Sequence, residues 1–169
     1  MSDITEQEIK FIQKQLGRPP EGLQEIVYRD SKKDPVVLRV TSIVRGKPFP
    51  NMYWLSDKSL CKAIDKIESH GFVKELENII IPQNEILKEK INLNHQQYIQ
   101  KRWNYFIAEH NIKTILPAYV ESLKTKGIGG LSKFKRVRCL HMHYAHYLVD
   151  GNSIGELLEE KFNLAQHIS

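Results

Sequence analysis

The residues best suited to chemistry lie in one short segment, residues 139–146, which contains a cysteine and three histidines. If this segment is helical, Cys139, His143, His146 and Asp150 share one side of the helix, because steps of four, three and four residues nearly complete whole turns. Thiol, imidazole and carboxylate groups can bind metal ions, attack an electrophile or transfer protons. We therefore expect the functional centre here.

Two catalytic chemistries are open to this segment. As a nucleophile, Cys139 would be activated by a helix N-terminus and the preceding basic residues, with His141 or His146 as acid or base. As a metal site, the segment offers suitable ligands, but consecutive turns of one helix rarely complete a tetrahedral shell and no Cys-x-x-Cys motif occurs. We expect no metal ion.

A third chemistry is anion binding by the stretch that precedes the segment. Glycines in residues 127–130 let backbone amides approach a ligand, a basic run at residues 133–138 neutralises it, and a helix start after Val137 adds its dipole. No Gly-Lys-Ser or Gly-Lys-Thr follows, so the sequence does not match a P-loop. The expected ligand is a phosphate-bearing, nucleotide-like small molecule. Its expected binding residues here are Gly127, Gly129, Gly130, Lys135, Arg136, Arg138 and His143.

Three residues elsewhere are candidates for the same site. Arg102 shares a helix face with aromatic residues, so its guanidinium is expected inside the protein or on a cleft wall. Its partner would be a ligand anion or an internal carboxylate such as Asp150 or Glu156. Arg18 is fixed between a glycine and two prolines. Asn152 either caps a helix or binds the ligand.

Each of these features also has a purely structural interpretation. Histidines often lie at the edge of a core, and a glycine string often joins two helices. Two further functions therefore stay open. One is an RNA-binding accessory protein that uses residues 133–138 against the phosphate backbone. The other is a scaffold without a ligand.

The pattern of apolar residues predicts the elements that position this segment. Helices are expected over residues 5–15, 58–70, 84–109, 112–124, 137–149 and 153–162. Residues rich in β-branched and aromatic types predict strands at 23–28, 36–44 and 52–55, with a turn at 45–47. We expect an α+β fold in which a small antiparallel sheet of about three strands is packed by five or six helices, forming a single domain over residues 1–169.

Composition sets the broad class of protein. Apolar residues make up 41% and charged residues 27%, which is typical of a globular domain large enough to fold without a disulfide. The net charge of +5 permits phosphate contact without requiring it. No signal peptide or membrane span is visible and only two cysteines occur, so we expect a cytoplasmic protein with free thiols.

Several strings, in order along the chain, resemble the bacterial domain-of-unknown-function family number 501. They are Leu16-Gly17-Arg18-Pro19-Pro20-Glu21-Gly22, Pro48-Phe49-Pro50, Tyr53-Trp54-Leu55, Gly127-Ile128-Gly129-Gly130, Cys139-Leu140-His141, Ala145-His146, and Asn152 with Gly155. The resemblance runs from about residue 8 to 160 and implies a stand-alone bacterial cytoplasmic protein without an assigned reaction. It adds weight to Arg18, Gly127, Gly129, Cys139, His141, His146 and Asn152.

The chain also departs from this family pattern. Many members resemble a form with cysteines after the first strand and a Thr-Cys-Pro string after Tyr-Trp-Leu. Here residues 30–33 and 56–58 contain no cysteine. If those cysteines help other members bind a metal with the Cys-Leu-His string, that shell is incomplete here, which again disfavours a metal ion.

Overall fold

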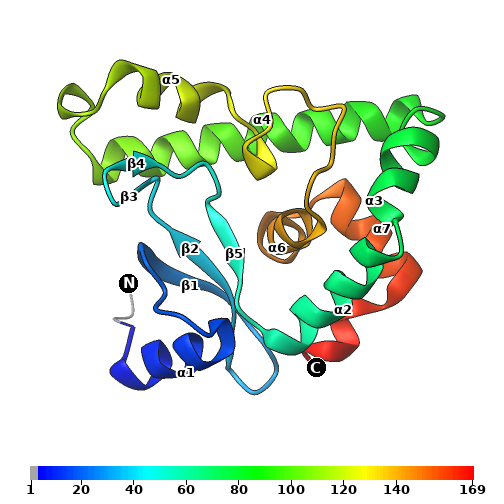
Figure 1. The fold of residues 1–169 in the computed structure, drawn as a ribbon, viewed down its shortest axis with the longest axis horizontal. Helices are drawn as coiled ribbons and strands as arrows, with labels where there is room; N and C mark the ends of the chain where they lie inside the picture. Colours follow the sequence, from blue (N-terminus) through cyan, green and yellow to red (C-terminus); the bar gives the residue numbers. More distant parts are fainter. Residues whose placement is uncertain (1–3) are drawn as a thin grey trace.

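The computed structural model describes residues 4–169 as helices packed around a small sheet (Figure 1). The three-stranded antiparallel sheet has the order β1–β2–β5, with β1 at Leu23–Arg29, β2 at Pro35–Val40 and β5 at Tyr53–Leu55. The described residues form seven α-helices: α1 (Glu6–Leu16), α2 (Lys58–Ser69), α3 (Phe72–Glu75), α4 (Glu85–Glu109), α5 (Pro117–Thr125), α6 (Leu140–Asp150) and α7 (Ser153–Phe162). The predicted α+β class is confirmed.

The sheet is covered on both faces, which explains why β2 reads as an almost continuous apolar run. All six residues of β2 are buried. Val37 belongs to the main core, which also contains Tyr144 of α6. Leu38 points the other way and lines a small hollow with Leu16 at the end of α1. A strand buried on both faces favours apolar residues on both faces instead of in alternation, and the one charged residue of β2, Arg39, is paired with Glu25 and Glu109.

Helix starts follow the capping residues expected from the sequence. Thr5 and Glu8 form a capping box at the start of α1. Asp57 accepts a hydrogen bond from the Leu60 amide at the start of α2, and Asn152 accepts two at the start of α7. Side-chain oxygens at these positions satisfy amides that have no partner inside the helix.

Three predicted boundaries were wrong. The strand predicted at 36–44 ends at Val40, and β3 (Ile43–Val44) pairs separately with β4 (Lys47–Pro48) through a turn in which Arg45 and Gly46 both have positive φ. The helix predicted at 112–124 is split into a short 3₁₀ turn, Ile112–Thr114, and α5, because Pro117 favours the first helical position. The helix predicted from residue 137 begins at Leu140, since the chain is extended at Cys139 and left-handed at Arg138.

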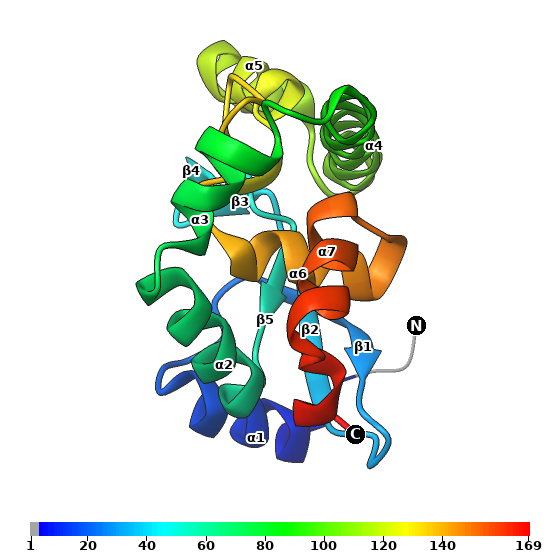
Figure 2. The same ribbon diagram turned by 90° about the vertical axis from the view of Figure 1, so that its right-hand side faces the viewer.

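Helix α6 lies at the centre of the protein (Figures 1 and 2). It contacts β5 on one side and α2 and α7 on others, while α4 and α5 run together along another edge. Buried residues of α6 therefore belong to the core, whereas its N-terminal end meets α2 and the loop after α5. This position decides which of its histidines are accessible.

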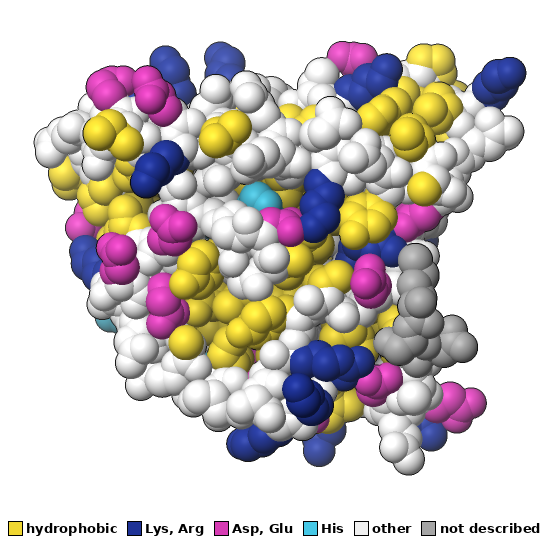
Figure 3. Space-filling model, turned by 180° about the vertical axis from the view of Figure 1, so that it is seen from behind, with side chains coloured by type: hydrophobic (Ala, Val, Ile, Leu, Met, Phe, Trp, Pro, Cys, Tyr) yellow, Lys and Arg dark blue, Asp and Glu magenta, His cyan; other side chains and the backbone are white. Residues whose placement is uncertain are grey.

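The described surface is mixed in character. On the side opposite to the view of Figure 1, hydrophobic side chains gather near the centre, and Lys and Arg side chains lie in several separate places with acidic ones between them (Figure 3). No helix within residues 4–169 is both long enough and apolar enough to cross a membrane.

Candidate functional site

Cys139 and His141 meet Glu68 of α2 at the N-terminal end of α6. The Cys139 Sγ lies 3.7 Å from His141 Nδ1, and the same nitrogen lies 3.3 Å from Glu68 Oε1. The Leu140 amide donates to Glu68 Oε1 at 2.6 Å. We call Glu68, Cys139 and His141 the Cys–His–Glu cluster. All three side chains are partly buried.

The second ring nitrogen of His141 faces α2 as well. His141 Nε2 lies 3.2 Å from the Cys61 carbonyl oxygen and 3.3 Å from Asp65 Oδ1. Burial alone would lower the pKa of His141, but hydrogen bonds with Cys139 and Glu68 outweigh it and raise the pKa to about 10. Burial raises the pKa of Glu68, but the hydrogen bonds from His141 and Leu140 prevail and hold that pKa below its usual value.

A cavity of about 260 Å³ lies where the glycine loop meets the start of α6. We call it the glycine-loop cavity. Its lining consists of Pro50, Asn51, Ser122, Lys126, Gly129, Gly130, Arg138, Cys139 and Met142. Among these described residues two are cationic and none is acidic. The predicted meeting of the 127–130 loop with the Cys/His segment is therefore present, and Cys139 belongs to both the cavity and the Cys–His–Glu cluster.

Arg138 is held along the glycine loop by its own backbone and side chain. Its φ of 66° is left-handed, and its Nη1 donates to the Gly129 carbonyl at 2.9 Å. Gly129 and Gly130 also have positive φ, which glycine adopts without strain. The loop thus turns tightly enough to bring the guanidinium to the cavity.

Other members of the basic run lie elsewhere. Lys135 lines a separate hollow of about 540 Å³ with Phe134 and Glu77. Arg136 is exposed and lies 3.9 Å from Glu77, whose carboxylate also accepts from the Val137 amide at 2.7 Å. Neither residue lines the glycine-loop cavity. At the N-terminus of α6, which was expected to point its dipole at a ligand, the Leu140 amide donates to Glu68.

The remaining histidines of α6 are core residues. His143 is 1% and His146 2% exposed. His146 Nδ1 bonds with Asn152 at 3.2 Å, and its ring packs against Tyr53 and Tyr98. Burial lowers the pKa of His146 to about 4 and, with neighbouring histidines, that of His143 to about 3. The predicted stripe that groups these two histidines with Cys139 was wrong, because Cys139 turns toward His141 and Glu68.

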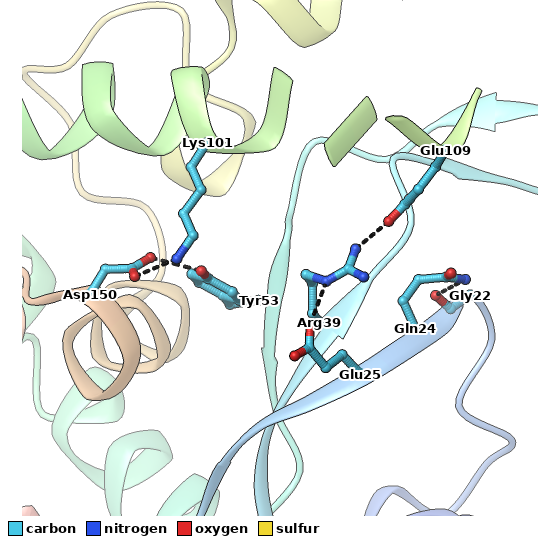
Figure 4. Close-up of polar contacts among 8 residues, drawn as sticks. All are labelled: Gly22, Gln24, Glu25, Arg39, Tyr53, Lys101, Glu109 and Asp150. Atoms are coloured by element: carbon cyan, nitrogen blue, oxygen red, sulfur yellow. Dashed lines mark hydrogen bonds and ion pairs between the residues drawn. The ribbon is translucent and has the colours of Figure 1, made fainter. Parts of the chain in front are cut away.

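Asp150 was expected on the same stripe but has its own partners (Figure 4). It accepts a hydrogen bond from Tyr53 at 2.7 Å and pairs with Lys101 at 2.5 Å. Tyr53 has a raised pKa because of burial and this hydrogen bond. His146 Nε2 lies farther from Asp150, at 3.7 Å, so the carboxylate mainly serves Lys101 and Tyr53.

Arg102 is fully buried, as predicted, but it pairs with neither Asp150 nor Glu156. Its guanidinium donates to the carbonyls of Pro50 at 2.6 Å and of Leu123 and Lys126 at 2.5 Å each. Burial lowers the pKa of Arg102. Since Pro50 and Lys126 line the glycine-loop cavity, Arg102 supports the cavity wall without lining it.

Arg18 and Asn152 also lie away from the cavity lining. The exposed Arg18 guanidinium stacks on Trp54, with 4.2 Å between its carbon and the ring centroid. Asn152 is 2% exposed and caps α7 while bonding His146. Gly127 is excluded from the lining too, because it packs against His95. These three residues therefore have structural contacts, and none of them lines the glycine-loop cavity.

Comparison with known proteins places the site within a family. Residues 26–160 match the model of the family described as "Protein of unknown function (DUF501)". The chain belongs to this family. The DUF501 match includes Glu68, the glycine loop and the Cys–His–Glu cluster, and it begins after Arg18. Searches of curated proteins and of solved structures found no match.

Sequence reasoning missed Glu68, Asp65 and His95 as neighbours of the site. Glu68 and Asp65 lie on the polar side of α2, where acidic residues are usually solvated, so no local pattern marks them. His95 accepts from the Ile128 amide at 3.0 Å and stacks on Phe134. The signal in the sequence for a buried His95 was the position of His95 between Ile91 and Tyr98, on the apolar side of α4.

Proposed function

We propose that this DUF501 protein binds a phosphate-bearing small molecule in the glycine-loop cavity. The observation that carries the proposal is the lining, which places Arg138 and Lys126 beside Gly129 and Gly130 without an acidic residue among the described lining residues. Cations and backbone amides next to glycines are the groups that proteins use to hold phosphate. The cavity volume suits a phosphate group with part of the molecule that carries it.

Cys139 is where a reaction on the bound molecule would take place. Its side chain lines the cavity and lies beside His141, and a cysteine paired with a histidine is the arrangement of thiol nucleophiles. His146 is left out of this role because it is buried against Tyr53 of β5 and Tyr98 of α4. The proposal also keeps the expected cytoplasmic location, which suits two free cysteines.

The test compares two arginines of the same basic run. Thermal unfolding of the wild type in EDTA is followed with inorganic phosphate, ribose 5-phosphate or adenosine monophosphate. We expect at least one to raise the melting temperature, since a ligand that binds only the folded state stabilises it. Arg138→Ala should abolish the shift, whereas Arg136→Ala, outside the cavity, should retain it. No shift with any of these compounds in the wild type would refute the proposal.

RNA binding gives a different pattern in the same experiment. Contacts along a phosphate backbone would weaken steeply with added salt, and Arg136→Ala and Arg138→Ala would weaken them to similar extents. A short single-stranded RNA as probe, measured at two salt concentrations, therefore separates the two functions. Equal losses in both variants would favour RNA over the cavity.

A further inference from the structure

We propose that the Cys–His–Glu cluster is a binding site for one zinc ion. Glu68 comes from α2, whereas Cys139 and His141 come from the start of α6, so two elements distant in sequence supply the ligands. Thiolate, imidazole and carboxylate are the three side-chain groups that bind zinc in proteins. The site goes beyond phosphate binding, because its ligands are distinct from Arg138 and Lys126, and with zinc bound Cys139 would serve as a metal ligand instead of as the nucleophile.

The spacing of the three ligand atoms fits a tetrahedral zinc ion. With a Zn–S bond of about 2.3 Å and Zn–N and Zn–O bonds near 2.1 Å, tetrahedral angles separate sulfur from nitrogen by roughly 3.6 Å and nitrogen from oxygen by roughly 3.4 Å. The corresponding distances here are 3.7 Å from Cys139 Sγ to His141 Nδ1 and 3.3 Å from that nitrogen to Glu68 Oε1. All three ligand atoms lie within 4.8 Å of one another. Small movements would therefore suffice to enclose the ion.

The surroundings of His141 and Glu68 orient them as ligands. Histidines that bind metals usually donate their other ring N–H to a carbonyl or carboxylate, which leaves a lone pair on the ligating nitrogen. His141 Nε2 faces the Cys61 carbonyl and Asp65, so Nδ1 is the nitrogen that faces Cys139 and Glu68. The Leu140 amide donates to Glu68 Oε1, the same oxygen that faces His141, and so holds the carboxylate in place as outer hydrogen bonds do for ligating carboxylates.

Three protein ligands leave the fourth zinc position open. Such open sites are typical of catalytic zinc, where a water molecule or substrate completes the shell. Because Cys139 also lines the glycine-loop cavity, an ion held by the cluster would lie at the edge of that cavity. Binding would replace the protons on Cys139 Sγ and on His141 Nδ1 by bonds to the metal, with release of those protons to solvent.

This proposal reverses the expectation of no metal. From the sequence, no Cys-x-x-Cys motif was found elsewhere to complete a shell with the ligands of one helix, and one helix does not close a tetrahedral shell. Glu68 removes that objection because it approaches from α2. The cysteines of the family pattern near residues 30–33 and 56–58, which this chain lacks, are not needed for a zinc site made of Glu68, Cys139 and His141.

The experiment measures zinc and cobalt binding by the full chain in phosphate-free buffer. After equilibrium dialysis against zinc chloride, we expect about one zinc per chain by elemental analysis. Cobalt should give the thiolate-to-metal charge-transfer band that reports a Cys–Co bond. Cys139→Ser should remove that band, and Glu68→Gln, which still accepts the Leu140 hydrogen bond, should weaken zinc binding at least tenfold.

Cys61→Ser is the matched control, since its carbonyl contacts His141 but its thiol is not part of the cluster. It should bind zinc within twofold of the wild type. A wild type without the cobalt band would overturn the proposal even if a variant failed to fold. Equal zinc retention by Cys139→Ser and the wild type would also overturn it, as would loss of the band in Cys61→Ser alone. Phosphate binding in EDTA is tested separately, so either proposal can fail without the other.

Discussion

Gly127 lies against the imidazole ring of His95 so closely that a side chain has no room. A Cβ at residue 127 would lie 2.3 Å from His95 Nδ1 and 2.7 Å from Phe134. The same ring stacks on Phe134 with 4.2 Å between centroids and accepts the Ile128 amide. This contact between α4 and the glycine loop fixes one end of the loop that forms the glycine-loop cavity.

We expect Gly127→Ala to destabilise the protein by about 3 kcal/mol, because a close-packed site relieves such an overlap only by moving its neighbours. Gly46→Ala is the control. Unlike Gly127, it has a φ of 72° that is unfavourable for alanine, but nothing lies within 4 Å of the added Cβ, so only a backbone cost of about 1 kcal/mol applies. Urea unfolding of both variants checks this prediction. Equal losses of unfolding free energy in the two variants would contradict the prediction, because they would mean that His95 moves aside freely.

From the sequence, the glycines of residues 127–130 were expected to let backbone amides approach a ligand, but the reason for glycine differs between positions of the loop. Gly129 and Gly130 do have left-handed φ, whereas Gly127 does not and is needed for packing. Nothing local to the loop could indicate this, because His95 is more than thirty residues earlier. Local signals predicted the helix caps and the strands at 23–28 and 52–55 well, since those depend on neighbouring residues.

A pH dependence of stability is expected from the buried neutral histidines. Burial lowers the pKa of both His95 and His146 from 6.5 to about 4. A histidine with a depressed folded pKa supports the fold above pH 6.5, and this support is lost as pH falls from 6.5 toward 4. At about 1.4 kcal/mol per pKa unit, each contributes on the order of 3 kcal/mol over that range.

His146→Phe tests this dependence, since phenylalanine can pack beside Tyr53 and Tyr98 without binding a proton. Its unfolding free energy should fall less than that of the wild type between pH 7.5 and pH 5. His70→Gln, at an exposed position, should follow the wild type. If the unfolding free energies of His146→Phe and the wild type changed in parallel with pH, the burial of a neutral His146 would be contradicted.

Arg102 connects three backbone segments, so its replacement should affect both stability and the cavity. Arg102→Met would leave the carbonyls of Pro50, Leu123 and Lys126 without their donors inside the protein. We expect a loss of at least about 3 kcal/mol, because each buried unsatisfied group costs roughly 1–3 kcal/mol. Arg102→Lys should lose less, since one ammonium group keeps the charge but cannot reach all three carbonyls. Unfolding in guanidinium chloride measures the stability of both variants. An unchanged unfolding midpoint in Arg102→Met would contradict the role of Arg102 in holding the three carbonyls.

In the candidate site too, the sequence located the segment, but the contacts of that segment depend on residues distant in sequence. The pattern of residues 139–146 correctly marked a region of unusual chemistry, but helical periodicity grouped Cys139 with His143 and His146. Cys139 precedes the first turn of α6, where its side chain is free of the helical spacing and meets His141 and Glu68. The choice of neighbours was set by α2, which no pattern within α6 could reveal.

The two cysteines should differ sharply in their reaction with iodoacetamide. Burial and nearby aspartates raise the pKa of Cys61 to about 12, so few Cys61 thiolates exist at neutral pH. Cys139 lines the glycine-loop cavity and lies beside His141, which gives the reagent access to a thiol paired with an imidazole. In EDTA at pH 7.5, peptide mapping by mass spectrometry should find Cys139 modified at least tenfold faster than Cys61, and His141→Ala should slow the modification of Cys139. Equal rates at the two cysteines would show that Cys139 is no more accessible or activated than a buried structural thiol.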